Sequence, residues 1–319
     1  MTAAPPVVAI VGPTASGKTA LSIEVAQRLD GEIISMDSRQ VYRGMDIGTA
    51  KATPEQVAKV PHHGLDLVDP SERFSAGRYA RYARARIEEI RGRGRVPLLV
   101  GGTGFFLRAL THPIFQEPAL DPERRRALAA LLRELPSDEL LRWLAALDAP
   151  TADRLRTGGG RQRLLRALEL PLLTGRPLSW WHTHAPAEAP PLRPLIFVLD
   201  LPRDELFAAI DRRVDDMVKA GLVDEVARLA AAGYDEEAPG MNATGYIELL
   251  PYLRGEISLD TALERIRKHT RAYAKRQLTW LRHQLPEGAV RLDASAPADE
   301  LADIVVRTVR EKQEAEGEG

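Results

Sequence analysis

The chain has 319 residues, of which 44% are hydrophobic and 28% charged, values typical of a folded globular protein. Cysteine is absent, which excludes disulfides, thiolate catalysis and zinc–thiolate sites, and the net charge of −1 favours no class of partner. No apolar run reaches the roughly 20 residues of a membrane-spanning helix, and the N-terminal residues lack the charged region of a signal peptide. We therefore expect a cytoplasmic protein without a membrane partner.

The most specific short motif follows the first apolar run. Val7–Val11 predicts a buried strand, the next eight residues read GPTASGKT, and a helix is predicted over Ala20–Leu29. This is a complete G-x-x-x-x-G-K-[ST] phosphate loop in the strand–turn–helix context that it requires. Its backbone N–H groups predict a site for two linked phosphates, with Lys18 as a point charge and the Thr19 hydroxyl on Mg²⁺. The predicted phosphate-binding residues are Gly12, Pro13, Thr14, Ala15, Ser16, Gly17, Lys18 and Thr19.

Further apolar runs alternate with helical patterns, which predicts an α/β fold of the P-loop NTPase type, with a parallel sheet flanked by helices. The expected strands are Glu32–Met36, Pro97–Gly102, Leu195–Leu199 and Val290–Leu292, and Tyr79–Arg91 is an expected helix. Residues 118–186 are rich in Ala, Leu and Arg between proline-rich stretches, and predict an all-helical insertion domain. The catalytic core would then be residues 1–117 and 187–319, with a disordered tail from about residue 311.

Asp37 follows the second predicted strand, and ligands of open parallel sheets collect beyond the carboxyl ends of the strands. Asp37 is therefore expected to face the same crevice as Lys18. A carboxylate there could bind Mg²⁺, act as a general base or cap the next helix, and its position leaves all three open. No acid follows the third strand, which ends in Gly101-Gly102-Thr103-Gly104. Because switch and motor NTPases place an Asp there, this argues against NTP hydrolysis.

Basic residues are concentrated near the C-terminal end. Residues 261–285 carry seven Lys and Arg against one Glu, and Arg267, Arg271 and Lys275 share one helical face. Such a stripe either follows a nucleic-acid backbone or forms a solvated surface. Arg213, on a helix after the returning strand, could bind a leaving phosphate or simply be solvated.

Longer segments resemble the tRNA dimethylallyltransferase family. They read GPTASGKTALSIE (12–24), DSRQVYRGMDIGTAK (37–51), PLLVGGTGFFLRAL (97–110), AIDRRVDDMVKAGLVDEV (209–226) and RAYAKRQLTWLR (271–282). With further matches between them, they span nearly the whole chain. The resemblance implies transfer of a dimethylallyl group from dimethylallyl diphosphate to N6 of the adenosine on the 3′ side of the anticodon.

The resemblance also implies roles for individual residues. The phosphate loop and Arg213 would hold the diphosphate leaving group with Mg²⁺ on Thr19, while nucleotide (ATP) binding rests on the loop motif alone. Asp37 would accept the N6 proton, and the implied catalytic residues are Asp37, Thr19 and Arg213. The insertion and the basic helix would bind opposite sides of the anticodon stem-loop of tRNA. The protein would be a monomer. The implied tRNA-binding residues are Asp37, Ser38, Arg39, Gln40, Thr103, Gln162, Arg163, Arg166, Gly245, Tyr246, Arg271, Lys275, Arg276, Gln277, Trp280 and Arg282.

The chain departs from the family pattern at a few positions. Phe106 replaces an aromatic hydroxyl, and Thr157-Gly158-Gly159-Gly160 replaces an acidic lead-in to a helix of the insertion. Three other functions compete with this interpretation: an adenylate isopentenyltransferase, a small-molecule P-loop kinase, and an RNA-binding module with a vestigial loop. The helical insertion and the basic helix argue against the first two, and the intact Lys18 and Asp37 against the third.

Overall fold

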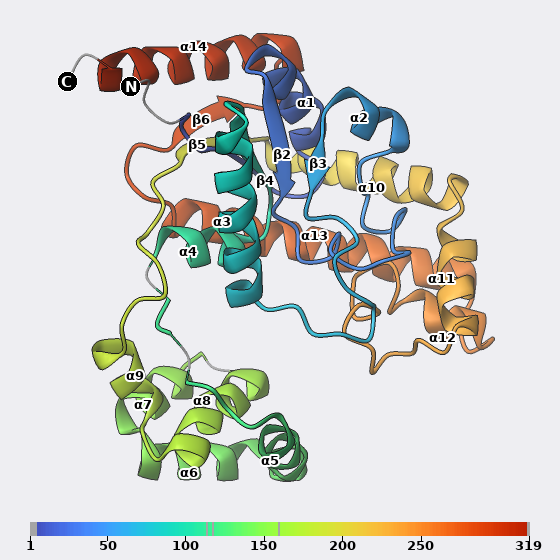
Figure 1. Cartoon of the computed structure of the whole chain (residues 1–319). Helices are drawn as coiled ribbons and strands as arrows, with labels where there is room; N and C mark the ends of the chain where they lie inside the picture. The colour runs from blue at the N-terminus through green and yellow to red at the C-terminus, as the bar shows by residue number, and fades with distance from the viewer. Residues whose placement is uncertain (1–4, 113, 117, 159, 318–319) are drawn as a thin grey trace. The chain divides into compact units, whose positions relative to one another are not determined.

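The computed structural model describes residues 5–112, 114–116, 118–158 and 160–317 (Figure 1). The chain divides into two compact units, a core unit (Met1–Thr111 with Leu192–Gly319) and an inserted unit (His112–Pro191). These boundaries lie a few residues outside the expected 118–186, because short connecting segments on both sides join the insertion.

The core unit is built on a parallel sheet that, in the described residues, has six strands in the order β3-β2-β4-β1-β5-β6. The strands are β1 (Val8–Val11), β2 (Gly31–Ser35), β3 (His62–His63), β4 (Val96–Gly101), β5 (Leu195–Asp200) and β6 (Val290–Asp293). Strand β1 is central and buried along its length, as parallel strands covered on both faces are. The α/β fold with helices flanking a parallel sheet, predicted from the sequence, is confirmed.

Strand β3 was not predicted, because its two polar residues carry no strand pattern. Its His62 and His63 pair with Ile33 and Ile34 of β2. The His63 ring lies 2.6 Å from a carboxylate oxygen of the buried Glu32, to which two arginines also donate hydrogen bonds. Burial raises the pKa of Glu32, but these hydrogen bonds outweigh it and hold the pKa at about 2. A polar cluster therefore anchors this edge of the sheet.

Helices cover both faces of the sheet. In the core unit they are α1 (Lys18–Arg28), α2 (Pro54–Lys59), α3 (Ala76–Gly92), α4 (Gly104–Thr111), α10 (Arg203–Lys219), α11 (Leu222–Ala231), α12 (Leu249–Leu253), α13 (Leu259–His283) and α14 (Ala298–Gly317). Helices α1 and α14 lie side by side and pack apolar residues such as Leu21, Val25 and Val305 onto the sheet (Figure 1). The tail expected to be disordered from about residue 311 is helical through Gly317, because its Glu, Lys, Gln and Ala residues are good helix formers.

The inserted unit contains the helices α5 (Pro122–Glu134), α6 (Ser137–Leu147), α7 (Ala149–Arg156), α8 (Arg161–Thr174) and α9 (Leu178–His184). Asp121 caps the start of α5 by accepting the N–H of Glu123. The unit has its own core, which includes Leu140, Leu144 and Leu168. Its buried Asp148 accepts the N–H groups of Thr151 and Ser179, and so joins two of its helices.

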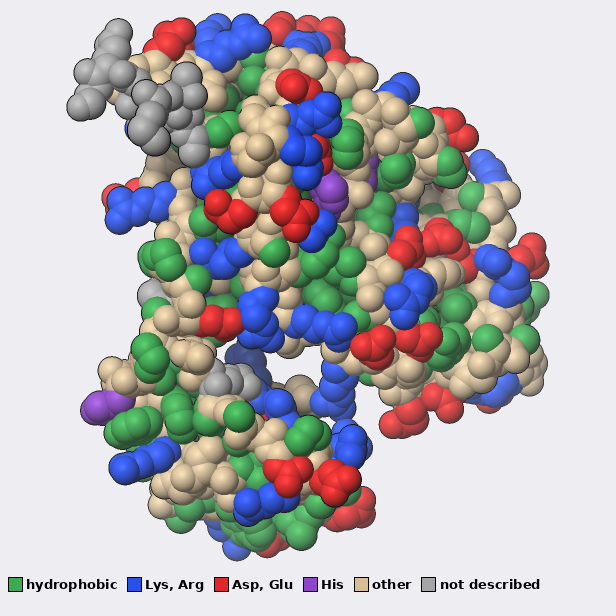
Figure 2. Space-filling model, in the orientation of Figure 1, with side chains coloured by type: hydrophobic (Ala, Val, Ile, Leu, Met, Phe, Trp, Pro, Cys, Tyr) green, Lys and Arg blue, Asp and Glu red, His purple; other side chains and the backbone are tan. Residues whose placement is uncertain are grey.

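No helix in the described part of the chain is long and apolar enough to cross a membrane. Figure 2 shows acidic and basic side chains intermixed over the visible face of the core unit, as the net charge of −1 suggests.

A buried carboxylate fixes the segment that follows β2. Glu225 of α11 is 1% exposed and accepts the N–H groups of Asp46, Ile47 and Gly48 at 2.8–3.1 Å. It also accepts the hydroxyl of the fully buried Tyr246 at 2.5 Å. A Cβ at Gly48 would lie 2.5 Å from the Tyr246 ring, so only glycine fits there. Four donors on one carboxylate therefore hold residues 46–48 in place.

We expect Tyr246→Phe to lower the free energy of unfolding by about 1.5–3 kcal/mol, the range for a hydrogen bond to a charged group. Urea unfolding followed by circular dichroism measures this loss. Tyr252→Phe is the matched control, since no hydrogen bond of its hydroxyl is found within the described residues, and should change the value by less than about 0.5 kcal/mol. Equal losses in the two variants would contradict a specific role for the Glu225 network.

Candidate active site at the phosphate loop

The phosphate loop closes directly after β1. A Cβ at Gly12 would lie 2.7 Å from the Ser16 hydroxyl oxygen and 3.0 Å from Leu199, so the first position of the motif must be glycine. The Ser16 hydroxyl and the Lys18 ammonium donate to the Pro13 carbonyl at 2.9 and 2.5 Å. Helix α1 begins immediately afterwards without a side-chain cap. The N–H groups of its first turn are thus available to an anion.

Two cations and one carboxylate share this end of the sheet. Burial and the neighbouring Arg213 lower the pKa of Lys18 to about 7, while Asp37 opposes the shift. Burial also lowers the pKa of Arg213, again against the attraction of Asp37. The sequence predicted that Asp37 faces the same crevice as Lys18 and left the role of Arg213 open; in the structure the three residues are close enough for their charges to act on one another. With two positive groups to one negative group, the site favours an anionic ligand.

Asp37 is held by the ends of β2 and β4. Its carboxylate accepts the N–H of Arg39 at 2.8 Å, and the adjacent N–H of Ser38 donates to the Thr103 hydroxyl oxygen at 3.1 Å. A Cβ at Gly101 would lie 2.1 Å from the Met36 carbonyl oxygen, so glycine permits this close approach of the two strand ends. Asp37 and Thr103 therefore lie beside each other, beyond the carboxyl ends of the strands.

Aromatic hydroxyls complete the surroundings of Asp37. Tyr273 of α13 shares a hydrogen bond with Thr103, and burial together with the Asp37 charge raises its pKa to about 12. Tyr79 of α3 is fully buried and stacks on Phe106 with ring centroids 4.1 Å apart. Its hydroxyl has no hydrogen-bond partner among the described residues, and burial raises its pKa well above the usual range. Sequence reasoning missed both tyrosines, because nothing local distinguishes them from core residues.

Several residues expected to contact RNA lie inside the core unit. Tyr246 donates to Glu225, and Gly245 donates its N–H to the buried Glu248 at 2.7 Å. Gln277 is 7% exposed and bonds to the backbone of the phosphate loop. Their polar groups are therefore used by the protein itself.

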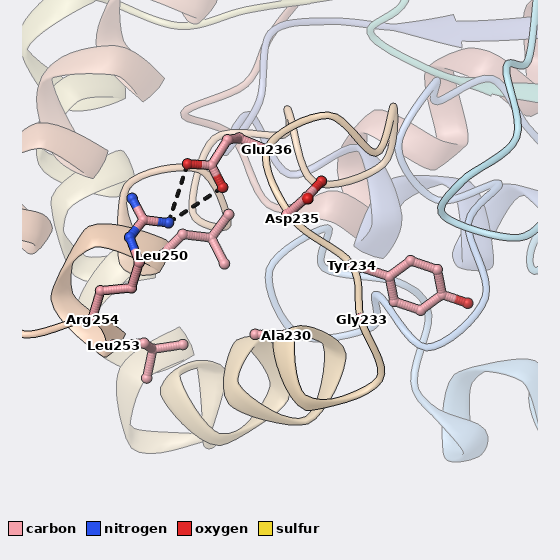
Figure 3. Close-up of a pocket in the computed structure, with 8 residues that line it drawn as sticks. All are labelled: Ala230, Gly233, Tyr234, Asp235, Glu236, Leu250, Leu253 and Arg254. Carbon is pink, nitrogen blue, oxygen red and sulfur yellow. Dashed lines mark hydrogen bonds and ion pairs between the residues drawn. The ribbon is translucent and has the colours of Figure 1, made fainter.

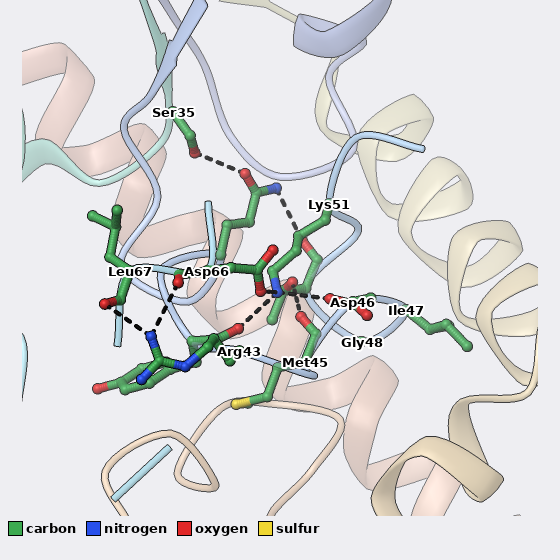
Figure 4. Close-up of polar contacts among 12 residues, drawn as sticks. Ser35, Arg43, Met45, Asp46, Ile47, Gly48, Lys51, Asp66 and Leu67 are labelled. Atoms are coloured by element: carbon green, nitrogen blue, oxygen red, sulfur yellow. Dashed lines mark hydrogen bonds and ion pairs between the residues drawn. The ribbon is translucent and has the colours of Figure 1, made fainter. Parts of the chain in front are cut away.

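Gln40 is likewise engaged internally. Its side-chain oxygen accepts the Ser35 hydroxyl, and its nitrogen donates to the carbonyls of Thr49 and Ala50. Nearby, Lys51 donates to Asp46 at 2.7 Å and to Asp66 at 2.5 Å (Figure 4). These contacts fix the chain between residues 37 and 51. Lys51 was not among the predicted site residues, and its membership in the DSRQVYRGMDIGTAK segment was the available signal.

Other expected RNA contacts lie at the surface. On α13, Lys275, Arg276 and Arg282 are exposed, whereas Arg271 is half-buried and bound to Asp211 at 2.6 Å. Arg39 donates to the Pro239 carbonyl, and Trp280 packs against Gly104.

In the inserted unit, Gln162 and Arg163 of α8 are exposed, and Arg166 pairs with Glu169. Of the departure from the family pattern at residues 157–160, Gly159 lies outside the described residues.

A separate hollow lies between α11 and α12 (Figure 3). Its lining includes Ala230, Tyr234, Leu250 and Leu253, and Arg254 bridges to Glu236 at 3.1 Å. None of the predicted site residues lines it, and its apolar and acidic walls do not suit a polyphosphate.

Two family models match this chain. The family model described as IPP transferase matches residues 40–284, and that described as isopentenyl transferase matches residues 5–67. The tRNA dimethylallyltransferase of Roseiflexus sp. (strain RS-1) is 46% identical over 302 residues, which cover 94% of this chain and 97% of that protein. That of Thermomicrobium roseum is 43% identical, covering 97% and 93%.

Two solved structures are also similar. The tRNA isopentenylpyrophosphate transferase of Bacillus halodurans has a TM-score of 0.69 and 37% identity, covering 98% of this chain and 99% of that chain. A eukaryotic dimethylallyltransferase described as acting on tRNA has a TM-score of 0.77 and 30% identity, covering 91% of this chain and 74% of that chain.

The lowered pKa of Lys18 predicts a measurable change of charge when an anion binds. We expect the Lys18 amine in the free protein to titrate with a midpoint near pH 7, and bound inorganic pyrophosphate to raise that midpoint because it favours the ammonium form. Carbon-13 NMR of protein labelled at the lysine ε-carbons follows the titration. The chain has only seven lysines, and Lys18→Arg identifies the signal by its loss. A midpoint near 10 in the free protein would contradict the crowding of charge at this site.

Proposed function

The chain belongs to the tRNA dimethylallyltransferase family, and from this premise we propose how its own residues perform the reaction. The enzyme transfers a dimethylallyl group from dimethylallyl diphosphate to N6 of the adenosine on the 3′ side of the anticodon. The bond between C1 of the donor and the bridging oxygen breaks, a bond from N6 to C1 forms, N6 loses a proton, and pyrophosphate leaves.

The observation that carries the assignment of roles is the grouping of Lys18, Arg213 and Asp37 beside the loop. The loop N–H groups, Lys18 and Arg213 bind the diphosphate and stabilise the negative charge that develops on it as the C1–O bond breaks. Arg213 lies close enough to Lys18 to lower its pKa, so one diphosphate can contact both cations. The contacts of the loop, Lys18 and Arg213 with the diphosphate thereby stabilise the leaving group.

Asp37 acts as the general base. Its carboxylate lies close enough to Lys18 and Arg213 to affect the pKa of both. The N–H of Arg39, at 2.8 Å, orients the carboxylate. The proton that N6 releases as it attacks C1 passes to this carboxylate. Thr103 is bonded to both Ser38 and Tyr273 and so helps to hold the chain beside Asp37.

A Mg²⁺ ion fits this site with few protein ligands. Among the described residues, no group of three or more His, Cys, Asp or Glu residues could hold a metal ion. Mg²⁺ is usually held by one or two protein oxygens together with substrate phosphates and water. The exposed Thr19 hydroxyl at the start of α1 is the oxygen that would hold it. When bound, the ion neutralises charge on the diphosphate.

The adenine must leave the stack of the anticodon loop to reach Asp37, as in other enzymes that act on nucleobases. The exposed Lys275, Arg276 and Arg282 of α13 provide phosphate contacts, and Gln162 and Arg163 of the inserted unit contribute others. Gln40 acts indirectly, by holding the carbonyls of residues 49 and 50. A tRNA substrate supports a cytoplasmic location for the enzyme.

One experiment separates this function from its competitors. Purified protein and Mg²⁺ are given radiolabelled dimethylallyl diphosphate with unmodified tRNA, with AMP or with no acceptor. We expect label on tRNA alone. Label on AMP alone would identify an adenylate isopentenyltransferase, and ATP consumption with a metabolite would identify a kinase.

Asp37→Ala should lower the rate of transfer at saturating substrates by about 10²–10⁴-fold, the range for loss of a general base. Asp37→Asn keeps the shape of the side chain and should lose nearly as much, because its amide cannot accept the proton. Single-turnover kinetics with pre-bound tRNA measures the chemical step. An unchanged rate in either variant would remove Asp37 from this role.

Lys275→Ala should weaken tRNA binding and reduce the slope of log Kd against log salt concentration by about one unit, as expected for one lost phosphate contact. Filter binding at several salt concentrations gives the slope. The matched control is Lys312→Ala, an exposed lysine on α14, which should leave the slope unchanged. A loss of rate at saturating tRNA with unchanged affinity would instead place Lys275 in the chemistry.

A further inference from the structure

One face of α13 lies against the phosphate loop and the end of β4. Tyr273, Gln277 and Trp280 are spaced by four and three residues, so they share a helical face. Tyr273 shares a hydrogen bond with Thr103, and the Trp280 ring fills the space beside Gly104, where a Cβ would lie 2.2 Å from it. Helix α13 is therefore seated on the strand ends that carry the site.

Gln277, at the middle of this face, joins two strand ends. Its side-chain oxygen accepts the N–H of Thr14 in the phosphate loop at 2.9 Å, and its side-chain nitrogen donates to the Gly102 carbonyl after β4 at 3.0 Å. A Cβ at Gly102 would lie 2.2 Å from that nitrogen, so the chain leaves room for this amide alone. The amide accepts and donates at once, whereas a carboxylate cannot donate and an apolar side chain does neither.

The same helix exposes basic side chains close to this bridge. Lys275 and Arg276 immediately precede Gln277 and are both exposed. Helix α13 thus carries, within three residues, two exposed cations and a buried side chain bonded to the phosphate loop. The hydrogen bond from the Thr14 N–H to Gln277 therefore connects α13 directly to the phosphate loop.

We propose that Gln277 is a positioning residue that couples binding of tRNA on α13 to binding of the diphosphate in the loop. The inference rests on the proposed function, because it takes the exposed face of α13 as RNA-binding. When RNA fixes α13, the amide fixes Thr14 and so the first half of the loop. By reciprocity, a diphosphate in the loop favours the position of α13 that binds RNA.

The test measures the Kd of a fluorescent anticodon stem-loop RNA by anisotropy, with and without saturating inorganic pyrophosphate and Mg²⁺. In the unchanged protein, pyrophosphate should tighten RNA binding by about 5- to 150-fold, the usual range for coupled sites. In Gln277→Leu the effect should fall below about twofold, while the Kd without pyrophosphate changes by less than about threefold. A merely structural role would change both values together.

Two further variants keep the result interpretable. Gln277→Glu retains the acceptor for Thr14 and loses the donor for Gly102, so it too should lose most of the coupling, and it replaces the leucine variant if that fails to fold. Gln284→Leu, at the end of the same helix and bonded to Arg108, is the matched control and should keep full coupling.

Coupling that persists in Gln277→Leu and Gln277→Glu, or that is absent from the unchanged protein, overturns the proposal. Transfer of label to tRNA, measured on the same samples, separates this result from the proposed function. Protein that prenylates tRNA without coupling contradicts the role of Gln277 alone, whereas protein that transfers no label contradicts the function.

Discussion

The structure depends on two neighbouring cations that share a single carboxylate. Lys18 and Arg213 both lose solvation at the carboxyl end of the sheet. This loss lowers the pKa of each side chain. Holding two partly buried like charges close together is unfavourable unless an anion joins them, so the site favours a ligand with several negative charges. The charge of Asp37 offsets part of this repulsion.

The rest of the core unit serves to keep these groups close. Glycines at positions 12, 101, 102 and 104 allow the backbone of β1, the end of β2, the end of β4 and the side of α13 to approach without a Cβ between them. Two side chains hold the chain after β2 in place. Glu225 accepts backbone N–H groups, and Lys51 donates to carboxylate groups. The close approaches and the buried hydrogen bonds together hold the strand ends and residues 46–51 in place.

The sequence predicted what depends on local pattern. Buried parallel strands give continuous apolar runs, and a phosphate loop is nearly self-contained, so β1, the loop and α1 follow from a short stretch of chain. The two-residue strand β3 carries no such pattern and exists because Glu32 and its partners hold it. Gln277 and Tyr246 belong to segments that resemble the family, yet a motif does not distinguish a side chain that binds substrate from one that supports the site. That distinction depends on contacts between residues more than 20 positions apart, which only the folded chain brings together.

The central claim is that the phosphate loop binds a leaving group, so that the bond broken is carbon–oxygen and not phosphorus–oxygen. Dimethylallyl diphosphate labelled with oxygen-18 at the ester oxygen, between C1 and the first phosphorus, tests this claim directly. The acceptor is tRNA, and mass spectrometry identifies the labelled products. The account predicts that all of the label appears in inorganic pyrophosphate in amounts equal to the modified adenosine. Label retained in dimethylallyl alcohol, with phosphate groups passed to another acceptor, would contradict it.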